Sequence, residues 1–239
     1  MGEVLVRPEE RDYTRQEIVV AGIPMQADRS GALFWPGQSI LVVADMHLEK
    51  GSALAERGSF LPPYDTRTTL GRLARTLETY EPQTVVCLGD SLHDRRAAER
   101  LAEDDIEVVR RLQAGRDWIW VTGNHDPDLP EDLGGRVVPE LAVGGLVLSH
   151  EPKAGQFVRQ IAAHLHPAAR VARHGYVLRR PCFIADARRL IMPAFGAYTG
   201  GLNILDASFA NLFGDADFRV WVIGHEGIYP VAPSQLRAD

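Results

Sequence analysis

The sequence predicts an α/β fold in which a parallel sheet is followed by a second, mixed sheet packed on it. In the first half of the 239 residues, short apolar runs alternate with amphipathic stretches, which is typical of parallel strands joined by crossover helices. The second half is richer in short β-like runs. No repeat, low-complexity stretch or obvious linker separates the halves, so we expect one domain over residues 1–239.

Apolar and alternating runs predict the strands of the first half. Between them, Asp65 is expected to cap a helix through Thr79, and Asp94 is expected to cap a long helix to Gln113. Residues 51–64 contain glycine and a pair of prolines, which predicts an irregular loop. The predicted strands are residues 17–20, 32–35, 39–44, 84–88 and 117–122, with a turn at residues 28–31.

Short β-like runs in the second half predict the second sheet. They are residues 137–138, 146–149, 176–178, 182–184, 190–192 and 220–223. Gly224-His225-Glu226 looks like a metal motif but lacks a second histidine, so we interpret it as a turn between two late strands.

Composition limits the classes of function. The chain has 26 Lys and Arg against 32 Asp and Glu, a net charge of −6, so any nucleic-acid contact must come from a local basic patch. Cys87 and Cys182 lie in apolar runs, which favours buried free thiols and a reducing compartment. The charged N-terminus predicts no signal peptide, and no run is long enough to cross a membrane. We therefore expect a cytoplasmic protein.

Five groups of polar residues follow predicted strands, and together they offer carboxylate, amide and imidazole donors. This mixture suits a pair of divalent first-row metals better than the all-thiolate or all-oxygen sets of other metal sites. Because ligands sit at the carboxyl ends of parallel strands, we expect the groups to converge. Each group alone has another interpretation, as a turn or a structural histidine. They are Asp45-Met46-His47, Gly89-Asp90, Gly123-Asn124-His125-Asp126, His150 and His164-Leu165-His166.

The five groups in this order resemble the calcineurin-like metallophosphoesterases, whose signature is D-x-H, G-D, G-N-H-D, H and G-H-x-H. The one departure is Ala163, where the family usually has glycine, and it removes no ligand. The resemblance implies a sandwich of two mixed β-sheets flanked by helices, with two divalent metal ions. It also implies the ligands: Asp45, His47 and His166 for the first metal, Asn124, His150 and His164 for the second, and Asp90 as the bridge.

Two residues of the third group are expected to take part in catalysis. By the resemblance, His125 would face the leaving group as a general acid or as a donor to a non-bridging oxygen. Asp126 would orient the His125 ring. His93 could reach the substrate or support a ligand, whereas its neighbour Asp94 is already explained as a helix cap.

Further stretches are similar to the bacterial ligase-associated DNA damage response endonucleases. The similarity covers about residues 40–201. It implies a manganese-dependent endonuclease on single-stranded DNA, with iron and zinc as alternative metals, that is encoded beside a DNA ligase, a helicase and an exonuclease. The stretches are residues 61–65, 150–152, 180–183 and 192–201, and Pro167 directly after His166.

The residues themselves support DNA binding more weakly. Arg173 and Arg180 belong to a basic cluster after the last metal motif, which either contacts phosphates or is a solvated loop. Tyr198, among glycines, could stack on a base. The negative net charge instead favours a phosphodiesterase or phosphatase for a small nucleotide. A catalytically silent scaffold for repair partners is a further alternative, against which the complete ligand set argues.

Overall fold

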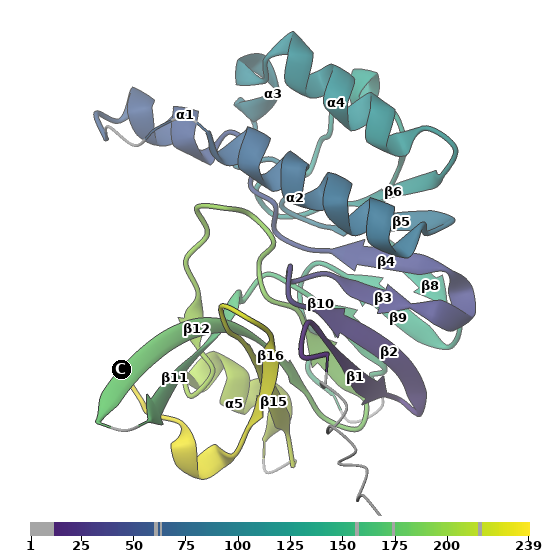
Figure 1. Ribbon diagram of the computed structural model, residues 1–239. Helices are drawn as coiled ribbons and strands as arrows, with labels where there is room; N and C mark the ends of the chain where they lie inside the picture. The colour runs from purple at the N-terminus through teal and green to yellow at the C-terminus, as the bar shows by residue number, and fades with distance from the viewer. Residues whose placement is uncertain (1–11, 60–61, 63, 156–157, 174, 215–216) are drawn as a thin grey trace, which may run out of the picture.

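Two β-sheets lie face to face, and helices cover the outer side of each (Figure 1). The computed structural model describes residues 12–59, 62, 64–155, 158–173, 175–214 and 217–239, with the side chain of Arg173 left out. The predicted arrangement of two mixed sheets flanked by helices is confirmed.

The first sheet has seven strands in the order in which they follow along the chain. The pairs from β1 to β4 are antiparallel, and the pairs from β4 to β7 are parallel. The parallel part with crossover helices was predicted from the alternating pattern and is confirmed. The strands are β1 (Arg15–Val20), β2 (Ile23–Asp28), β3 (Leu33–Trp35), β4 (Ile40–Val43), β5 (Thr84–Leu88), β6 (Asp117–Val121) and β7 (Arg136–Val138).

The second sheet is mixed and has nine strands among the described residues. Its main order is β14-β11-β12-β13-β10-β9-β8, and β15 pairs with both β12 and β16. The strands are β8 (Glu140–Val143), β9 (Leu146–Ser149), β10 (Gln160–Ala162), β11 (Pro167–Arg173), β12 (Tyr176–Ala185), β13 (Arg189–Ile191), β14 (Leu202–Asn203), β15 (Arg219–Ile223) and β16 (Ile228–Val231).

The helices lie outside this sandwich. Among the described residues, none has both the length and the apolar character that a membrane span requires. They are α1 (Lys50–Glu56), α2 (Asp65–Tyr80), α3 (Ala97–Arg100), α4 (Glu103–Gln113) and α5 (Ala207–Phe213), with the short 3-10 helices η1 (Pro36–Gln38), η2 (Glu131–Leu133) and η3 (Pro233–Gln235).

Side-chain alternation along the strands produces three apolar layers. In β4, Val42 faces the second sheet and joins the core between the sheets, whereas Leu41 and Val43 pack under α2 and α4. A third layer lies between the second sheet and α5, where Phe209 is buried. Because both faces of β4, β5 and β6 are covered, the sequences of these strands are nearly continuous apolar runs.

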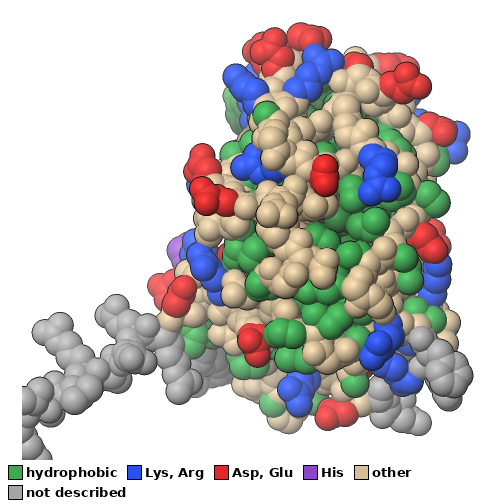
Figure 2. Space-filling model, turned by 90° about the vertical axis from the view of Figure 1, so that its right-hand side faces the viewer, with side chains coloured by type: hydrophobic (Ala, Val, Ile, Leu, Met, Phe, Trp, Pro, Cys, Tyr) green, Lys and Arg blue, Asp and Glu red, His purple; other side chains and the backbone are tan. Residues whose placement is uncertain are grey.

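The parallel strands begin on one side of the molecule and end on the other. Figure 2 views the side where they begin, and shows acidic and basic side chains scattered around hydrophobic ones. The five polar groups of the sequence all lie at the opposite, carboxyl ends of their strands. The fold therefore delivers the candidate ligands to one edge.

Three predictions about helices were wrong. Residues 50–56 form α1 rather than part of an irregular loop. Asp65 is the first residue of α2 rather than its cap, because its carboxylate accepts a hydrogen bond from the Gly51 N–H at 2.9 Å and joins α1 to α2. The long helix expected after Asp94 is two helices, α3 and α4, separated at residues 101–102.

The strand predictions need three corrections. Residues 17–20 and 32–35 do not pair with each other, because β2 lies between them and forms a tight turn with β1 at Ala21-Gly22. Residues 137–138 belong to β7 of the first sheet, not to the second. The predicted strands also omitted β8, β10, β11, β14 and β16, and they divided the single strand β12 into two runs, residues 176–178 and 182–184.

We predict that the packing between the sheets dominates stability. Phe183 on β12 is fully buried in this core, so Phe183→Ala should lower the free energy of unfolding by about 3–5 kcal/mol. Tyr176→Ala, on the same strand but 75% exposed, serves as the control and should change it little. Denaturant unfolding measures both, and equal losses would contradict this account of the core.

Candidate metal centre

The loops that carry the five polar groups are bonded to one another through their backbones. The Asp45 N–H donates to the Gly89 carbonyl at 3.2 Å, and the His47 N–H donates to the Asp90 carbonyl at 2.9 Å. The first two groups therefore continue the pairing of β4 with β5 beyond the strands. The Ala163 N–H donates to the His150 carbonyl at 2.9 Å and links the last two groups in the same way.

The backbone is strained at several candidate ligands. Positive φ angles occur at Asp45 (49°), His47 (44°), Asp90 (45°), His164 (70°) and His166 (44°). Such conformations cost energy for residues other than glycine and gather at functional sites. Here they turn consecutive side chains toward one point. Ala163, in contrast, has no positive φ and is buried in the core between the sheets, so its methyl group is accommodated.

Two glycines allow the groups to approach closely. A Cβ atom on Gly89 would lie 2.3 Å from Nδ1 of His150, and one on Gly123 would lie 2.1 Å from Oδ1 of Asp90. Both distances are far below van der Waals contact. The glycines of the G-D and G-N-H-D groups are thus required by packing around the site, which is a stronger reason than turn formation alone.

The first cluster contains Asp45, His47 and His166. The two Nε2 atoms of the histidines are 3.2 Å apart, and Nε2 of His166 is 3.3 Å from Oδ1 of Asp45. Asp45 and His47 are buried, and burial, followed by the charge of His166, lowers the pKa of His47 to about 2. A neutral imidazole presents a lone pair, so this cluster suits a cation.

The second cluster contains Asn124, His150 and His164. Oδ1 of Asn124 is 2.9 Å from Nε2 of His150 and 3.0 Å from Nδ1 of His164, and these two nitrogens are 3.1 Å apart. Nδ1 of His150 lies 3.3 Å from the Leu88 carbonyl, so a neutral ring that donates there can offer Nε2 to a cation in place of the hydrogen bond to Asp90. Three acceptor atoms around one point again suit a cation.

Asp90 lies between the two clusters. Its Oδ2 is 3.4 Å from Nε2 of His150 and 3.9 Å from Nε2 of His47, and its Oδ1 accepts the His125 N–H at 2.9 Å. Burial alone would raise the pKa of Asp90, but the His150 hydrogen bond and nearby positive charge lower it to about 2. The structure therefore brings all seven predicted ligands together, with an ionised carboxylate at the centre.

The expected role of Asp126 is wrong. Its carboxylate accepts the backbone N–H groups of Asp90, Leu92 and Gly123, at 3.1, 3.0 and 3.0 Å. Nδ1 of the His125 ring instead lies 2.6 Å from the His93 carbonyl. Asp126 thus ties the loop after β5 to the loop after β6. Burial is the main reason that its pKa rises to about 6, although the backbone hydrogen bonds oppose this.

His93 and His125 lie beside the first cluster. Their rings stack with centroids 5.6 Å apart, and donor atoms of His47, His93 and His125 lie within 4.8 Å of one another. The His125 side chain is 40% exposed, with Nε2 3.9 Å from Oδ2 of Asp90, so a substrate can reach it. Burial, followed by the charge of Lys50, lowers the pKa of His93 to about 4.

The structure does not gather the predicted substrate residues in one place, and of those described only Arg180 lines the cleft of about 340 Å³ that opens beside His166. Arg180 is exposed and lines it, and Tyr198 is half-buried with its hydroxyl donating to the Pro62 carbonyl at 2.8 Å. The backbone of Arg173 lies in β11, but its side chain is outside the described part of the structure. Arg72, which lines the cleft from α2, was not predicted as a site residue, because an arginine in a helix gives no distinctive sequence signal.

Comparisons with known proteins agree with this geometry. The model of the calcineurin-like phosphoesterase family matches residues 38–167, more than half of the chain. The crystal structure of Pseudomonas putida nuclease MPE is 29% identical, covers 91% of this chain and 100% of that chain, and superposes with a TM-score of 0.72. A search of curated protein sequences found no significant match.

Two further solved structures are each 18% identical to this chain. Protein AQ665 of unknown function from Aquifex aeolicus covers 57% of this chain and 81% of its own, with a TM-score of 0.38. The phosphoesterase Yfce from E. coli covers 81% of this chain and 98% of its own, with a TM-score of 0.40.

The family implies two divalent metal ions, and the two clusters joined by Asp90 can hold them. The matched residues 38–167 include every one of the seven candidate ligands. The chain therefore belongs to the calcineurin-like phosphoesterase family and is a binuclear metallophosphoesterase.

Proposed function

We propose that this metallophosphoesterase is a manganese-dependent endonuclease that cuts single-stranded DNA in DNA repair. The observation that carries the proposal is the likeness to Pseudomonas putida nuclease MPE, which extends over 91% of this chain at 29% identity. The cleft beside His166 is open and lined by arginine, which suits a polymer of phosphodiesters. A DNA ligase, a helicase and an exonuclease are the proposed partners, and the cytoplasm is the proposed location.

We assign Asp45, His47 and His166 to one ion, Asn124, His150 and His164 to the other, and Asp90 to both. Nitrogen and oxygen donors without thiolate suit Mn²⁺, with iron and zinc as alternatives. When bound, the two ions supply a nucleophilic water at neutral pH and neutralise charge on the phosphate. The chain's own part is to hold the donors in place, through Asp126 and the strained backbone.

His125 is the proposed proton donor to the leaving oxygen. Its Nδ1 donates to the His93 carbonyl at 2.6 Å, so the ring keeps that proton while Nε2 gives its own to the leaving group. Arg173, Arg180 and Tyr198 are proposed to contact the DNA, as is His93 beside the scissile bond.

A phosphodiesterase or phosphatase for a small nucleotide is the second candidate, and the net charge of −6 favours it. A panel of substrates with Mn²⁺ separates the two. We predict that the protein cuts circular single-stranded DNA with a higher kcat/KM than it hydrolyses 2′,3′-cyclic nucleotides. A circular substrate reports endonuclease action only. Intact circles together with rapid hydrolysis of cyclic nucleotides would overturn the endonuclease proposal and favour the second candidate.

Removing the shared carboxylate should empty both metal sites. We predict that Asp90→Ala loses bound metal at both positions and loses hydrolysis of every substrate, because the Asp90 carboxylate lies beside histidines of both clusters. Asp104→Ala, on the exposed face of α4, makes the same change in charge and should retain both. Metal analysis and turnover measured on the same preparations test this, and near wild-type turnover in Asp90→Ala would refute the bridging assignment.

The role of His125 depends on the leaving group. A sugar alkoxide needs a proton, whereas a nitrophenolate leaves without one, and a general acid contributes about 10²–10⁴-fold where protonation matters. His125→Ala should therefore slow DNA cleavage far more than hydrolysis of a nitrophenyl phosphodiester, with both metals retained. His225→Ala, an exposed histidine on the β15–β16 turn, is the control. Equal losses on both substrates would mean that His125 binds phosphate instead of donating a proton.

A further inference from the structure

A second cleft, of about 370 Å³, lies between the N-terminal strands and α2. Four arginines line it: Arg15 from β1, Arg29 from the β2–β3 turn, and Arg72 and Arg75 from α2. The carboxylate in the lining is Asp28, which already accepts hydrogen bonds from the Tyr80 hydroxyl at 2.8 Å and the Ser30 N–H at 2.7 Å.

Among the described residues, the four arginines form no ion pairs. In the described part of the chain, none of them has a carboxylate oxygen within 4.0 Å, whereas seven other arginines do. Arg29 is held by a neutral acceptor, the His225 carbonyl at 3.0 Å. Arg15 lies over the Tyr80 ring, 5.0 Å from its centroid. Positive charge therefore exceeds negative charge in the lining of this cleft, where four guanidinium groups accompany the single carboxylate of Asp28.

Arg72 is the most constrained of the four. It donates to the Phe195 carbonyl and lies 4.5 Å from the Phe195 ring centroid, but its buried Nε has no hydrogen-bond partner among the described residues. Burial, followed by the charge of Arg75, lowers its pKa. Two guanidinium groups that repel each other, one of them largely withdrawn from water, are stabilised by an anion between or beside them.

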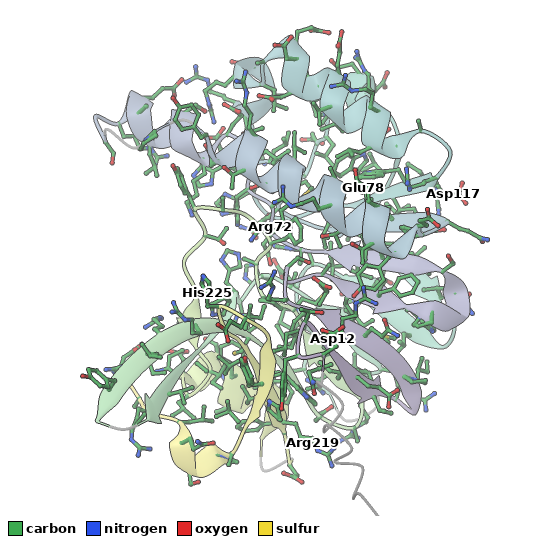
Figure 3. The ribbon with its side chains drawn as sticks, in the orientation of Figure 1. Asp12, Arg72, Glu78, Asp117, Arg219 and His225 are labelled. Atoms are coloured by element: carbon green, nitrogen blue, oxygen red, sulfur yellow. The ribbon has the colours of Figure 1, made fainter. Side chains whose placement is uncertain are left out.

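Arg72 also connects this cleft to the metal centre. It lines both the arginine cleft and the cleft beside His166, which contains Arg179 and Arg180. Figure 3 shows Arg72 on α2 and His225 on the β15–β16 turn, on the same side of the molecule. Because Arg72 lines both clefts, a ligand that occupied the two together would lie beside His166 and Arg180 in one and beside the other three arginines in the other. A single phosphate cannot span both clefts, but a chain of phosphates can.

We propose that the arginine cleft binds backbone phosphates of the DNA strand at nucleotides some distance from the bond that is cut. The inference rests on the proposed endonuclease function and extends it, because it gives the enzyme a binding track outside the metal centre. Neutral phosphodiester analogues and mononucleotides would not use the track. The overall negative charge is no obstacle, since the basic residues are local to the strand's path.

The test is the triple variant Arg15→Ala, Arg29→Ala, Arg75→Ala, which spares both Arg72 and the cleft beside His166. For a single-stranded oligonucleotide of about 20 nucleotides, we expect KM to rise about tenfold or more and kcat to change little. Each lost phosphate contact reduces the salt slope of log affinity by about 0.7, so the three together should reduce it by about 2. Hydrolysis of a nitrophenyl phosphodiester should be unchanged.

The matched control is Arg111→Ala, Arg136→Ala, Arg219→Ala, which removes the same charge from three exposed positions that line neither cleft. It should keep the wild-type KM and salt slope. An unchanged KM and slope in the first triple variant would overturn the track, as would equal effects of the two triple variants. If the Arg15→Ala, Arg29→Ala, Arg75→Ala variant lost nitrophenyl hydrolysis, these arginines would have a structural role and the proposed track would be overturned. If the wild-type protein hydrolyses the nitrophenyl ester but cuts no DNA, the proposed function itself fails, and the track fails with it.

Discussion

Seven donor side chains converge with Asp90 at their centre, and four of them, including Asp90, are buried. Their lone pairs lie about 3 Å apart, an arrangement that is unfavourable without positive charge between them. The rest of the fold is arranged around this constraint. Parallel strands bring the loops to one edge, and Gly89 and Gly123 remove the atoms that would keep the loops apart. The three apolar layers hold in place the strands from which these loops extend.

Asp126 shows how the loops are kept in register. A single carboxylate accepts three backbone N–H groups from the two loops that supply Asp90 and Asn124. Its neighbour His125 is consequently free to face the substrate side, with its ring held by the His93 carbonyl. Three adjacent residues of one motif thus have different roles. Asn124 faces the candidate metal site, His125 faces the substrate side, and Asp126 holds the two loops together.

Much of this was predictable from the sequence, because buried parallel strands and their polar ends leave strong local patterns. The groups at Asp45, Asp90 and Asn124 could be placed together from strand order alone. The hydrogen-bond partners of Asp126 could not be predicted, because nothing in the sequence indicates that a carboxylate next to a histidine accepts hydrogen bonds from backbone amides. Arg72 could not be predicted either, because its place in two clefts depends on how α2 packs beside Phe195 and the N-terminal strands. Helix α1 was missed because glycine and prolines nearby indicated a loop.

The central claim is that one site binds two ions that share Asp90. Manganese stoichiometry of the wild-type protein at saturation, measured by equilibrium dialysis with elemental analysis, tests it most directly. We expect two ions per chain, because two clusters of three donors flank one ionised carboxylate. Saturation at a single ion per chain, or at none, would contradict it.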